Sequence, residues 1–307
     1  MFFLRALPGA IADGLIWGLV AIGIYISFKI LDIADMTVDG SICTGGIVCL
    51  VLLDRGLPVW LCVILAFLAG ALCGCFTGLL HTVLGIPSIL AGILTQLMLY
   101  SVNVHILDGA SLAVVPPGAT LLLSSSEKGA AILTGALFVV GTIICLWLFF
   151  YTEIGLTIKS TGDNPDMSRA QGVNVDRNKV IGLAIANGIV AVAGALYAQF
   201  KGSMSLSEGR GAIVIGLAAI FIGLSVSMKI KPYFIVSLIG VVCGAIVYYI
   251  IYNFVILLGL DTDYLKMLTS LIVILFMGVP YIKGRYFTKR KPLPIAAQNQ
   301  SGGASDA

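Results

Sequence analysis

Charged residues are scarce in this sequence. Only 11% of its 307 residues are Asp, Glu, Lys or Arg, whereas 59% are hydrophobic. Soluble domains carry roughly 25% charged residues, and the mean hydropathy of this chain is +1.06. A chain with so little charge cannot cover its surface in water, which excludes an ordinary soluble protein. The sequence therefore predicts a polytopic membrane protein.

Signatures of catalysis are also missing. The sequence contains no GxxxxGK[ST] phosphate loop, no HExxH or GxSxG motif and no pair of carboxylates in an acid–base frame. Its two histidines, His81 and His105, are far apart and have no evident partners. We therefore expect no enzyme, no cofactor and no metal site. The energy for any active transport would have to come from an ion gradient or from a second protein.

Cysteine pairing is absent as well. No two cysteines form a CxxC pair, and buried cysteine behaves as a small hydrophobic residue, so neither a disulfide framework nor a zinc site is indicated. The seven cysteines all lie in apolar segments: Cys43, Cys49, Cys62, Cys73, Cys75, Cys145 and Cys243.

Apolar segments fill most of the chain. A transmembrane helix needs roughly 20 apolar residues. By that measure the candidates are Ile11–Ile30, Thr37–Leu53, Pro58–Leu80, Ile89–Ile106, Ala130–Phe150, Val180–Phe200, Ala212–Ser227, Tyr233–Leu258 and Leu265–Val279. The predicted fold is an all-α membrane protein, a polytopic helical bundle of about eight to ten transmembrane segments. Nine crossings place the N-terminus outside, whereas an even number places it inside.

Lysine and arginine indicate the side of each connection, because they concentrate in cytoplasmic loops. Five basic residues follow the last segment: Lys283, Arg285, Lys289, Arg290 and Lys291. They predict a cytoplasmic C-terminus rather than a nucleic-acid surface. Lys229, Lys231 and the loop Gly155–Lys179 then lie inside, and Leu107–Gly129, Gly202–Gly211 and Gly259–Tyr264 lie outside. We expect a transmembrane domain over residues 1–290 and a disordered cytoplasmic tail over 291–307.

Two stretches interrupt the apolar pattern. Asp32–Gly46 carries three acids and a Gly-Gly pair within or beside the second segment. It fits either a broken helix lining a pathway or a plain cytoplasmic turn, since non-helical backbone at membrane depth needs protein or water partners. Gly202–Gly216 predicts a short external helix that leads into the next span, with Glu208 and Arg210 near the outer mouth.

Polar residues within the spans are candidates for lining a solute pathway: Asp39, Ser41, Gln96, Asn103, Asn187 and Asn253. Each uncharged one could equally form an interhelical hydrogen bond. Asp35 and Asp39 are the only acids that would suit an ion-coupled carrier. Gly70, Gly74 and Gly78 form a small-residue face at four-residue spacing, which predicts close packing either within the chain or across a dimer.

The loop Gly155–Lys179 is the longest polar interval between two spans, and a connection needs only a few residues. Asp163-Asn164-Pro165 is a helix start, because Asx residues cap free N–H groups and proline fits the first turn. The sequence predicts a helix over Pro165–Gln171 that ends at Gly172, where glycine adopts the left-handed cap. Such a capped helix at the mouth of a bundle suggests a docking element for another protein.

Residues 162–175, GDNPDMSRAQGVNV, resemble the cytoplasmic-loop signature of ABC-importer permeases of the branched-chain amino acid and ribose type. Leu31–Ser41 resembles the broken second helix of that family, and Gly209–Gly223 resembles the segment that enters its pore region. The Thr-Val-Asp-Gly-Ser form at Thr37–Ser41 is most similar to permeases paired with tryptophan/tyrosine-type binding lipoproteins. The chain departs from the family pattern in lacking the Glu-Ala-Ala opening of the best-known coupling motif.

The resemblance implies a coupling helix that docks on a separate ATPase, where ATP hydrolysis takes place. The coupling residues carried over are Gly162, Asp163, Asn164, Pro165, Met167, Arg169, Ala170 and Gly172, with Arg169 expected to pair with an ATPase carboxylate. The resemblance also implies an importer in the bacterial plasma (inner) membrane. Its other subunits would be two ATPase copies, a second permease forming a homodimer, and an extracytoplasmic solute-binding lipoprotein.

The solute of such an importer is expected to be small. An amino acid fits the low charge of the spans, and an aromatic amino acid is the narrower form of this prediction. A sugar or nucleoside is the alternative cargo. An ion-coupled secondary carrier and a scaffolding membrane protein are the alternatives to an ABC importer. A carrier would need a mid-membrane acid or an unwound ion-binding helix.

Overall fold

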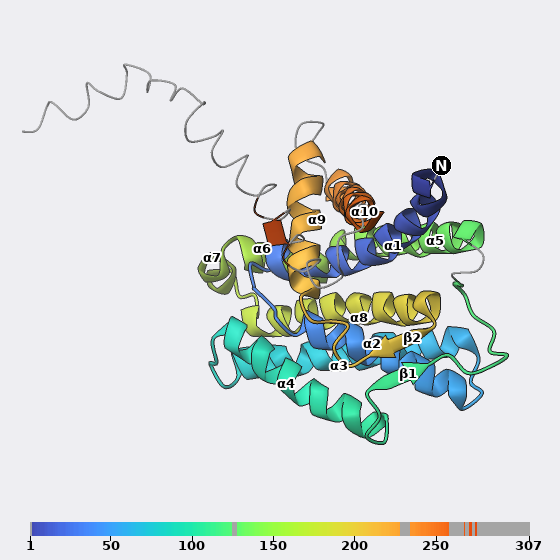
Figure 1. The fold of residues 1–307 in the computed structure, drawn as a ribbon. Coiled ribbons are helices and arrows are strands. Elements are labelled where there is room, and N and C mark those ends of the chain that lie inside the picture. Colours follow the sequence, from blue (N-terminus) through green and yellow to red (C-terminus); the bar gives the residue numbers. More distant parts are fainter. Residues whose placement is uncertain are drawn as a thin grey trace, which may run out of the picture.

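The structure is a computed structural model that describes residues 2–124, 128–227 and 234–257 together with positions 267, 270, 271 and 274. Its elements are, in chain order, α1 (Phe2–Tyr25), a π-helical turn η1 (Ile26–Ile30), α2 (Val38–Asp54), α3 (Val59–Thr82), α4 (Ser88–Ile106), β1 (Leu112–Val114), α5 (Lys128–Phe150), α6 (Glu153–Asp163), α7 (Pro165–Ala170), α8 (Val175–Lys201), β2 (Ser203–Ser205), α9 (Ala212–Ser227) and α10 (Phe234–Leu257). The helices form one bundle, and the two strands pair antiparallel at its edge (Figure 1).

The all-α membrane fold is confirmed. Eight of the nine predicted segments correspond to helices, and the ninth, Leu265–Val279, lies outside the described residues apart from the four positions named above. Within the described ranges, six helices are long and apolar enough to cross a membrane: α1 with η1, α3, α4, α5, α8 and α10. The two shorter helices, α2 and α9, have 17 and 16 residues.

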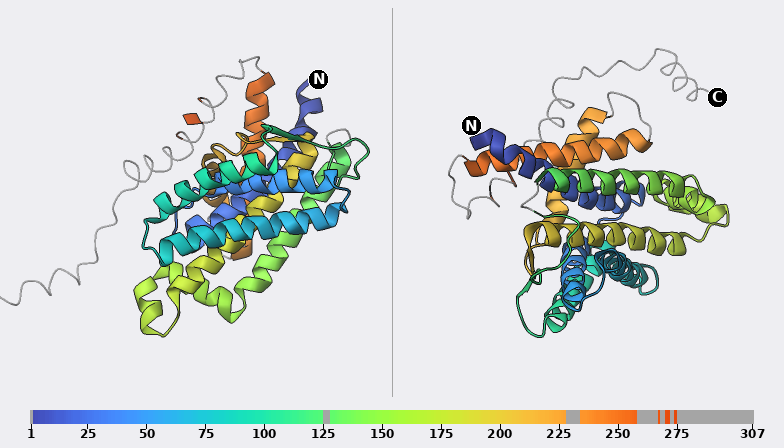
Figure 2. Two further views of the ribbon diagram at one scale, coloured as in Figure 1. Left: turned by 90° about the horizontal axis from the view of Figure 1, so that it is seen from below. Right: turned by 90° about the vertical axis from the view of Figure 1, so that its right-hand side faces the viewer.

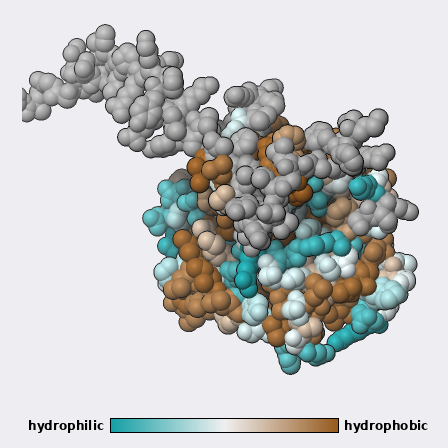
Figure 3. Space-filling view, viewed as in Figure 1, coloured by the Kyte–Doolittle hydropathy of each residue, from teal (hydrophilic) through white to brown (hydrophobic). Residues whose placement is uncertain are grey.

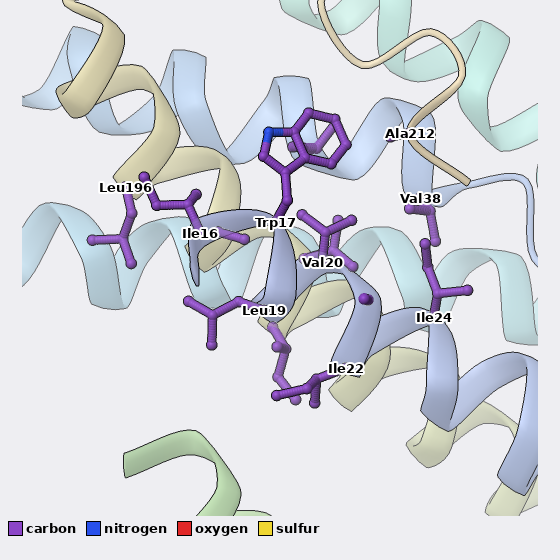
Figure 4. Packing of buried hydrophobic residues seen from close by; sticks show 14 of the residues in the cluster. Ile16, Trp17, Leu19, Val20, Ile22, Ile24, Val38, Leu196 and Ala212 are labelled. Carbon is purple, nitrogen blue, oxygen red and sulfur yellow. The ribbon is translucent and has the colours of Figure 1, made fainter. Parts of the chain in front are cut away.

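The first helix lies at the centre of the bundle. α1 packs against α5, α8, α9 and α10, and its side chains Ile16, Trp17 and Ile22 extend into the surrounding core in different directions (Figure 4). A helix that is hydrophobic on every face is one that can be buried all round. At the end of this segment the α-helix changes to the π-helical turn η1, which contains Lys29.

The small-residue face of α3 packs within the chain. Gly70, Gly74 and Gly78 all face α8, and a Cβ at Gly78 would lie 2.8 Å from the Cα of Val180. Side chains at these three positions would push the two helices apart, so the spacing permits backbone contact of the kind that stabilises helices in lipid. The sequence left open whether this small-residue face packs within the chain or across a dimer, and in the structure it packs within the chain.

The predicted break in the second segment lies at its beginning. Residues 31–37 are not helical, whereas α2 is a continuous helix from Val38 onward. Gly45 and Gly46 therefore do not interrupt the helix; they allow the backbone of α8 to approach α2 closely. The non-helical stretch is buried at Asp35 and Thr37, as irregular backbone at membrane depth has to be.

The two ends of the bundle are distinct. The N-terminal end of α1 lies at one end, and α6 and α7 lie at the other (Figures 1 and 2). Gly162 of α6 contacts Ile30, at the end of η1, which fixes this arrangement. β2 and the C-terminus of α8 lie at the end away from α7. The predicted external helix in Gly202–Gly216 is absent: residues 206–211 form turns, and α9 begins at Ala212.

Candidate functional site

A short turn after α5 leads directly into α6. The hydroxyl of Thr152 accepts a hydrogen bond from the backbone N–H of Gly155 at 3.3 Å and caps the start of α6. Gly155, Ile158 and Thr161 recur every three residues and form the buried face of this helix. The sequence analysis missed α6, although the Thr-Glu start and the three-residue spacing were signals that could have revealed it.

α6 is fixed to two membrane-spanning elements. Gly162 packs so closely on the end of η1 that a Cβ would collide with the carbonyl oxygen of Ile30. The side-chain amide of Asn178, near the start of α8, donates a hydrogen bond to Thr161 Oγ1 at 3.0 Å. A displacement of α6 would therefore be transmitted to the end of the first span and to the beginning of α8.

α7 begins at Pro165, where the sequence predicts its start. The side chain of Asn164 accepts a hydrogen bond from the N–H of Met167 at 2.9 Å, and Gly172 has a φ of +82° just after the helix. Ser168 is buried, and its hydroxyl contacts that of Ser160 on α6 at 3.3 Å. This serine pair, which the sequence analysis did not single out, holds α7 against α6.

The outer surface of α7 is exposed to solvent. Gly162 is half-buried, and the other seven predicted coupling residues are exposed: Asp163, Asn164, Pro165, Met167, Arg169, Ala170 and Gly172. Met167 exposes 59% of its surface amid polar neighbours. Hydrophilic residues gather at the edge of the molecule where α6 and α7 lie (Figure 3).

Arg169 already has partners within its own loop. Its guanidinium lies 3.8 Å from Asp166 and 3.6 Å from Asp176, and all three side chains are more than half exposed. Exposed ion pairs contribute about 0–1 kcal/mol. Arg169 can therefore exchange these carboxylates for another one at low cost.

A second polar constellation lies in the middle of the bundle. Asn187, near the midpoint of α8, donates a 2.6 Å hydrogen bond to Asp35 and accepts one of 2.6 Å from Ser41. All three side chains are buried. The arrangement joins the non-helical stretch 31–37 and the first turn of α2 to α8, so Ser41 and Asn187 are engaged with each other.

A chain of hydroxyl groups continues this layer. Thr37 Oγ1 lies 2.7 Å from Thr77 Oγ1 on α3, which in turn lies 3.0 Å from Thr95 Oγ1 on α4. These three buried residues connect the break to two further helices. The layer therefore ties α2, α3, α4 and α8 together at one depth of the bundle.

Asp39 holds the start of α9. Its two carboxylate oxygens accept hydrogen bonds from the backbone N–H groups of Gly211 at 2.8 Å and Ile213 at 3.0 Å. The first N–H groups of a helix lack partners within the helix, and a carboxylate there also complements the helix dipole. α9 consequently begins level with the first turn of α2, near the middle of α8, rather than at the end of the bundle.

A cavity of about 410 Å³ opens beside Asp39. Three of the predicted pathway residues line it, namely Asp39, Gln96 and Asn103. The full lining is Asp39, Gly40, Cys43, Gln96, Leu97, Tyr100, Asn103, Leu206 and Arg210. Arg210 and Tyr100 were not among the predicted site residues, and no spacing in the sequence brings residues 206–210 down beside α4.

The remaining predicted pathway residues lie elsewhere. Ser41 and Asn187 belong to the buried layer described above, and neither lines the cavity. Asn253 donates to the carbonyl of Tyr249 in its own helix at 3.1 Å. In the part of the chain that the structure describes, no group of three His, Cys, Asp or Glu side chains could hold a metal ion.

Residues 8–277 match the family described as branched-chain amino acid transport system, permease component. The chain belongs to this permease family. It is thus a membrane-spanning subunit of an ABC importer and not itself an enzyme, since a separate subunit hydrolyses ATP. The family and the apolar helices together make this permease a multi-pass inner-membrane protein.

Individual relatives carry different cargo names. The permease is 35% identical to a tyrosine transport system permease protein of Clostridioides difficile over 87% of this chain and 88% of the relative. It is 24% identical to a ribose import permease protein of Haemophilus influenzae over 84% and 79% of the two chains. A nucleoside ABC transporter permease protein of Lactococcus lactis matches 30% of this chain at 35% identity. No solved structure matches the permease.

Proposed function

We propose that the permease carries an amino acid, with aromatic amino acids as the first candidates. An extracytoplasmic binding protein delivers this solute, and a separate ATPase drives transport by docking on α6 and α7. The observation that carries the docking part is the construction of α7. It is capped, exposed and attached through α6 to two spans. A short rigid helix can pass on a movement that a loose loop would absorb.

A second copy of the permease is the partner that the cavity supports. Gln96 lies near the middle of α4, and Arg210 is exposed beside it. An arginine facing lipid at that depth is costly, so this side of the bundle needs either protein or water against it. A homodimer enclosing a water-filled pathway between the two cavities meets that need. Two permeases would then dock two ATPase copies.

The choice of cargo rests on the low charge of the pathway and on the relatives. An amino acid carries two opposite charges that cancel, which suits a cavity holding one carboxylate and one guanidinium, Asp39 and Arg210. The relative named for tyrosine transport is more similar to this chain over its whole length than the one named for ribose import. A sugar or nucleoside importer remains the competing cargo class for the assays below.

Co-purification with the ATPase tests the docking surface. We expect the tagged wild-type permease to retain its ATPase, and Arg169→Glu and Met167→Asp to lose most of it, because both residues are exposed on α7 and each change places a negative charge there. Arg55→Glu is the matched control, since Arg55 follows α2 at the opposite end of the bundle. Each variant must elute as a monodisperse peak before the comparison is made.

Retention of the ATPase by both α7 variants would contradict docking at this helix. Uptake of solute into vesicles without ATP would favour an ion-coupled carrier instead. In that mechanism Asp35 or Asp39 would have to bind the ion, although each already accepts hydrogen bonds from neighbouring groups.

A further inference from the structure

The cavity beside α9 is lined by the guanidinium of Arg210 and the carboxylate of Asp39. Asp39 is engaged by the two N–H groups at the start of α9, where the helix dipole contributes roughly half a positive charge. Glu208, the other nearby acid, forms an ion pair with Lys201 and accepts a hydrogen bond from Tyr197. Among the described residues, the guanidinium of Arg210 makes no ion pair. It therefore lines the cavity with its hydrogen-bond donors unused by Asp39.

The polar side chains that line the cavity together with Arg210 have unused hydrogen-bonding capacity. Asn103 is 2% exposed and donates to Thr44 Oγ1 at 3.1 Å, but its Oδ1 has no hydrogen-bond partner within the described part of the chain. Gln96 is half-buried and makes no side-chain hydrogen bond to another described residue. Gln96 therefore offers the cavity an amide oxygen that no described residue uses.

The rest of the lining is suited to an apolar or aromatic side chain. Leu97 and Leu206 provide aliphatic walls, and Tyr100, 47% exposed, presents its ring. A volume of about 410 Å³ lies within the range of small-molecule sites, which is roughly 300–1,000 Å³. The cavity therefore brings a cation, hydrogen-bond acceptors and apolar surface together.

We propose that this cavity is a binding site for a zwitterionic amino acid within the membrane, with Arg210 binding its α-carboxylate. This inference rests on the proposed function and specifies its cargo. A guanidinium matches a carboxylate through two parallel hydrogen bonds. The α-ammonium group donates to Gln96, and the side chain lies against Leu97 and Tyr100. A neutral sugar would leave Arg210 unpaired in the middle of the bundle.

The test uses the complete transporter, with its ATPase and binding protein, reconstituted in proteoliposomes. Radiolabelled L-tyrosine and a set of other zwitterionic amino acids are the probes, and D-ribose is the neutral probe. We expect Arg210→Gln to lower ATP-driven amino-acid uptake by roughly 10-fold or more, and Arg210→Lys to lower it less, because lysine keeps the charge but loses the two-pronged geometry. Arg55→Gln, an arginine outside the cavity, should behave as wild type.

A second readout separates solute binding from a structural or docking role. Stimulation of ATP hydrolysis by the binding protein should stay within about twofold of wild type in Arg210→Gln. Loss of this stimulation together with uptake would overturn the proposal, because Arg210 would then serve assembly or binding-protein contact. If Arg210→Gln fails to assemble, Arg210→Lys decides: unchanged amino-acid uptake overturns the inference.

The outcomes also distinguish this inference from the proposed function. Amino-acid uptake by wild type and equally by Arg210→Gln leaves the proposed function intact and removes the role of Arg210. Uptake of ribose and of none of the amino acids by wild type overturns the cargo class and this inference together.

Discussion

Asn187, in the middle of α8, donates a 2.6 Å hydrogen bond to the carboxylate of Asp35, which lies 152 positions earlier in the chain. Asp35 belongs to the only non-helical stretch between α1 and α2, and its other oxygen accepts the backbone N–H of Thr37 at 2.9 Å. The amide therefore stabilises a carboxylate within a stretch that is not part of a helix. The bond gives the broken stretch a fixed position relative to α8.

Removing this amide should destabilise the permease. Asn187→Ala leaves a buried carboxylate short of a donor and also removes the partner of Ser41, so we expect a loss of roughly 2–3 kcal/mol, since hydrogen bonds to charged groups are worth about 1.5–3 kcal/mol. The measurement is the midpoint of thermal unfolding in detergent. Asn253→Ala is the matched control, because that amide bonds only within its own helix. Equal midpoints for the two variants would argue against a stabilising role for the Asp35 contact.

The local signals in the sequence were sufficient for the long apolar helices and for α7, although α6 was missed. Apolar length identified eight helices, and the cap at Asn164 and the glycine at Gly172 identified both ends of α7. These features depend on residues within a few positions of one another. Caps, turns and apolar runs can therefore be read without knowing the partners.

The cavity beside Asp39 could be predicted only in part, because its lining residues meet through tertiary contacts. Asp39 and Arg210 are 171 positions apart and come together because a carboxylate on α2 holds the start of α9. The sequence placed Arg210 near an outer mouth, since residues after a span are normally at the surface. Nothing local to residues 206–211 indicates that they turn back toward the middle of α8.

Close contact between α3 and α8 provides a second prediction. Gly74→Ala should lower the unfolding midpoint, because a Cβ there would collide with the backbone of Leu183 and Ala184. Overpacking of this kind typically costs about 1–3 kcal/mol. Gly141→Ala on α5 makes the identical change where nothing lies within 4 Å, and it should leave the midpoint unchanged. A midpoint for Gly74→Ala that matches that of Gly141→Ala would show that the two helices separate without cost.

The cap of α7 yields a prediction about coupling. Asn164→Ala removes the acceptor for the N–H of Met167, a loss of about 0.5–2 kcal/mol for a helix cap. A six-residue helix has little else to hold it, so we expect weaker ATPase retention and less solute moved per ATP hydrolysed. Asn164→Asp keeps the acceptor and should restore both.

Asn174→Ala is the control for that experiment. Asn174 caps α8 by accepting from the N–H of Arg177 at 3.0 Å, but α8 has 27 residues and extensive packing. The loss of its cap should therefore leave transport per ATP near the wild-type value. Equal defects in the two alanine variants would mean that the whole loop, rather than the α7 cap, determines coupling.

Membrane orientation is the final prediction. α7 and the C-terminal end of α2 lie at opposite ends of the bundle (Figure 1), and the positive-inside rule assigns the α7 end to the cytoplasm. Single cysteines at Met167 and Arg55, in a variant lacking the seven native cysteines, should therefore react differently with a membrane-impermeant maleimide. Met167→Cys should be labelled only in inside-out vesicles and Arg55→Cys only in intact cells with a permeabilised outer envelope. The reverse pattern would place the docking helix outside, where no ATPase could reach it, and would overturn both the orientation and the coupling role of α7.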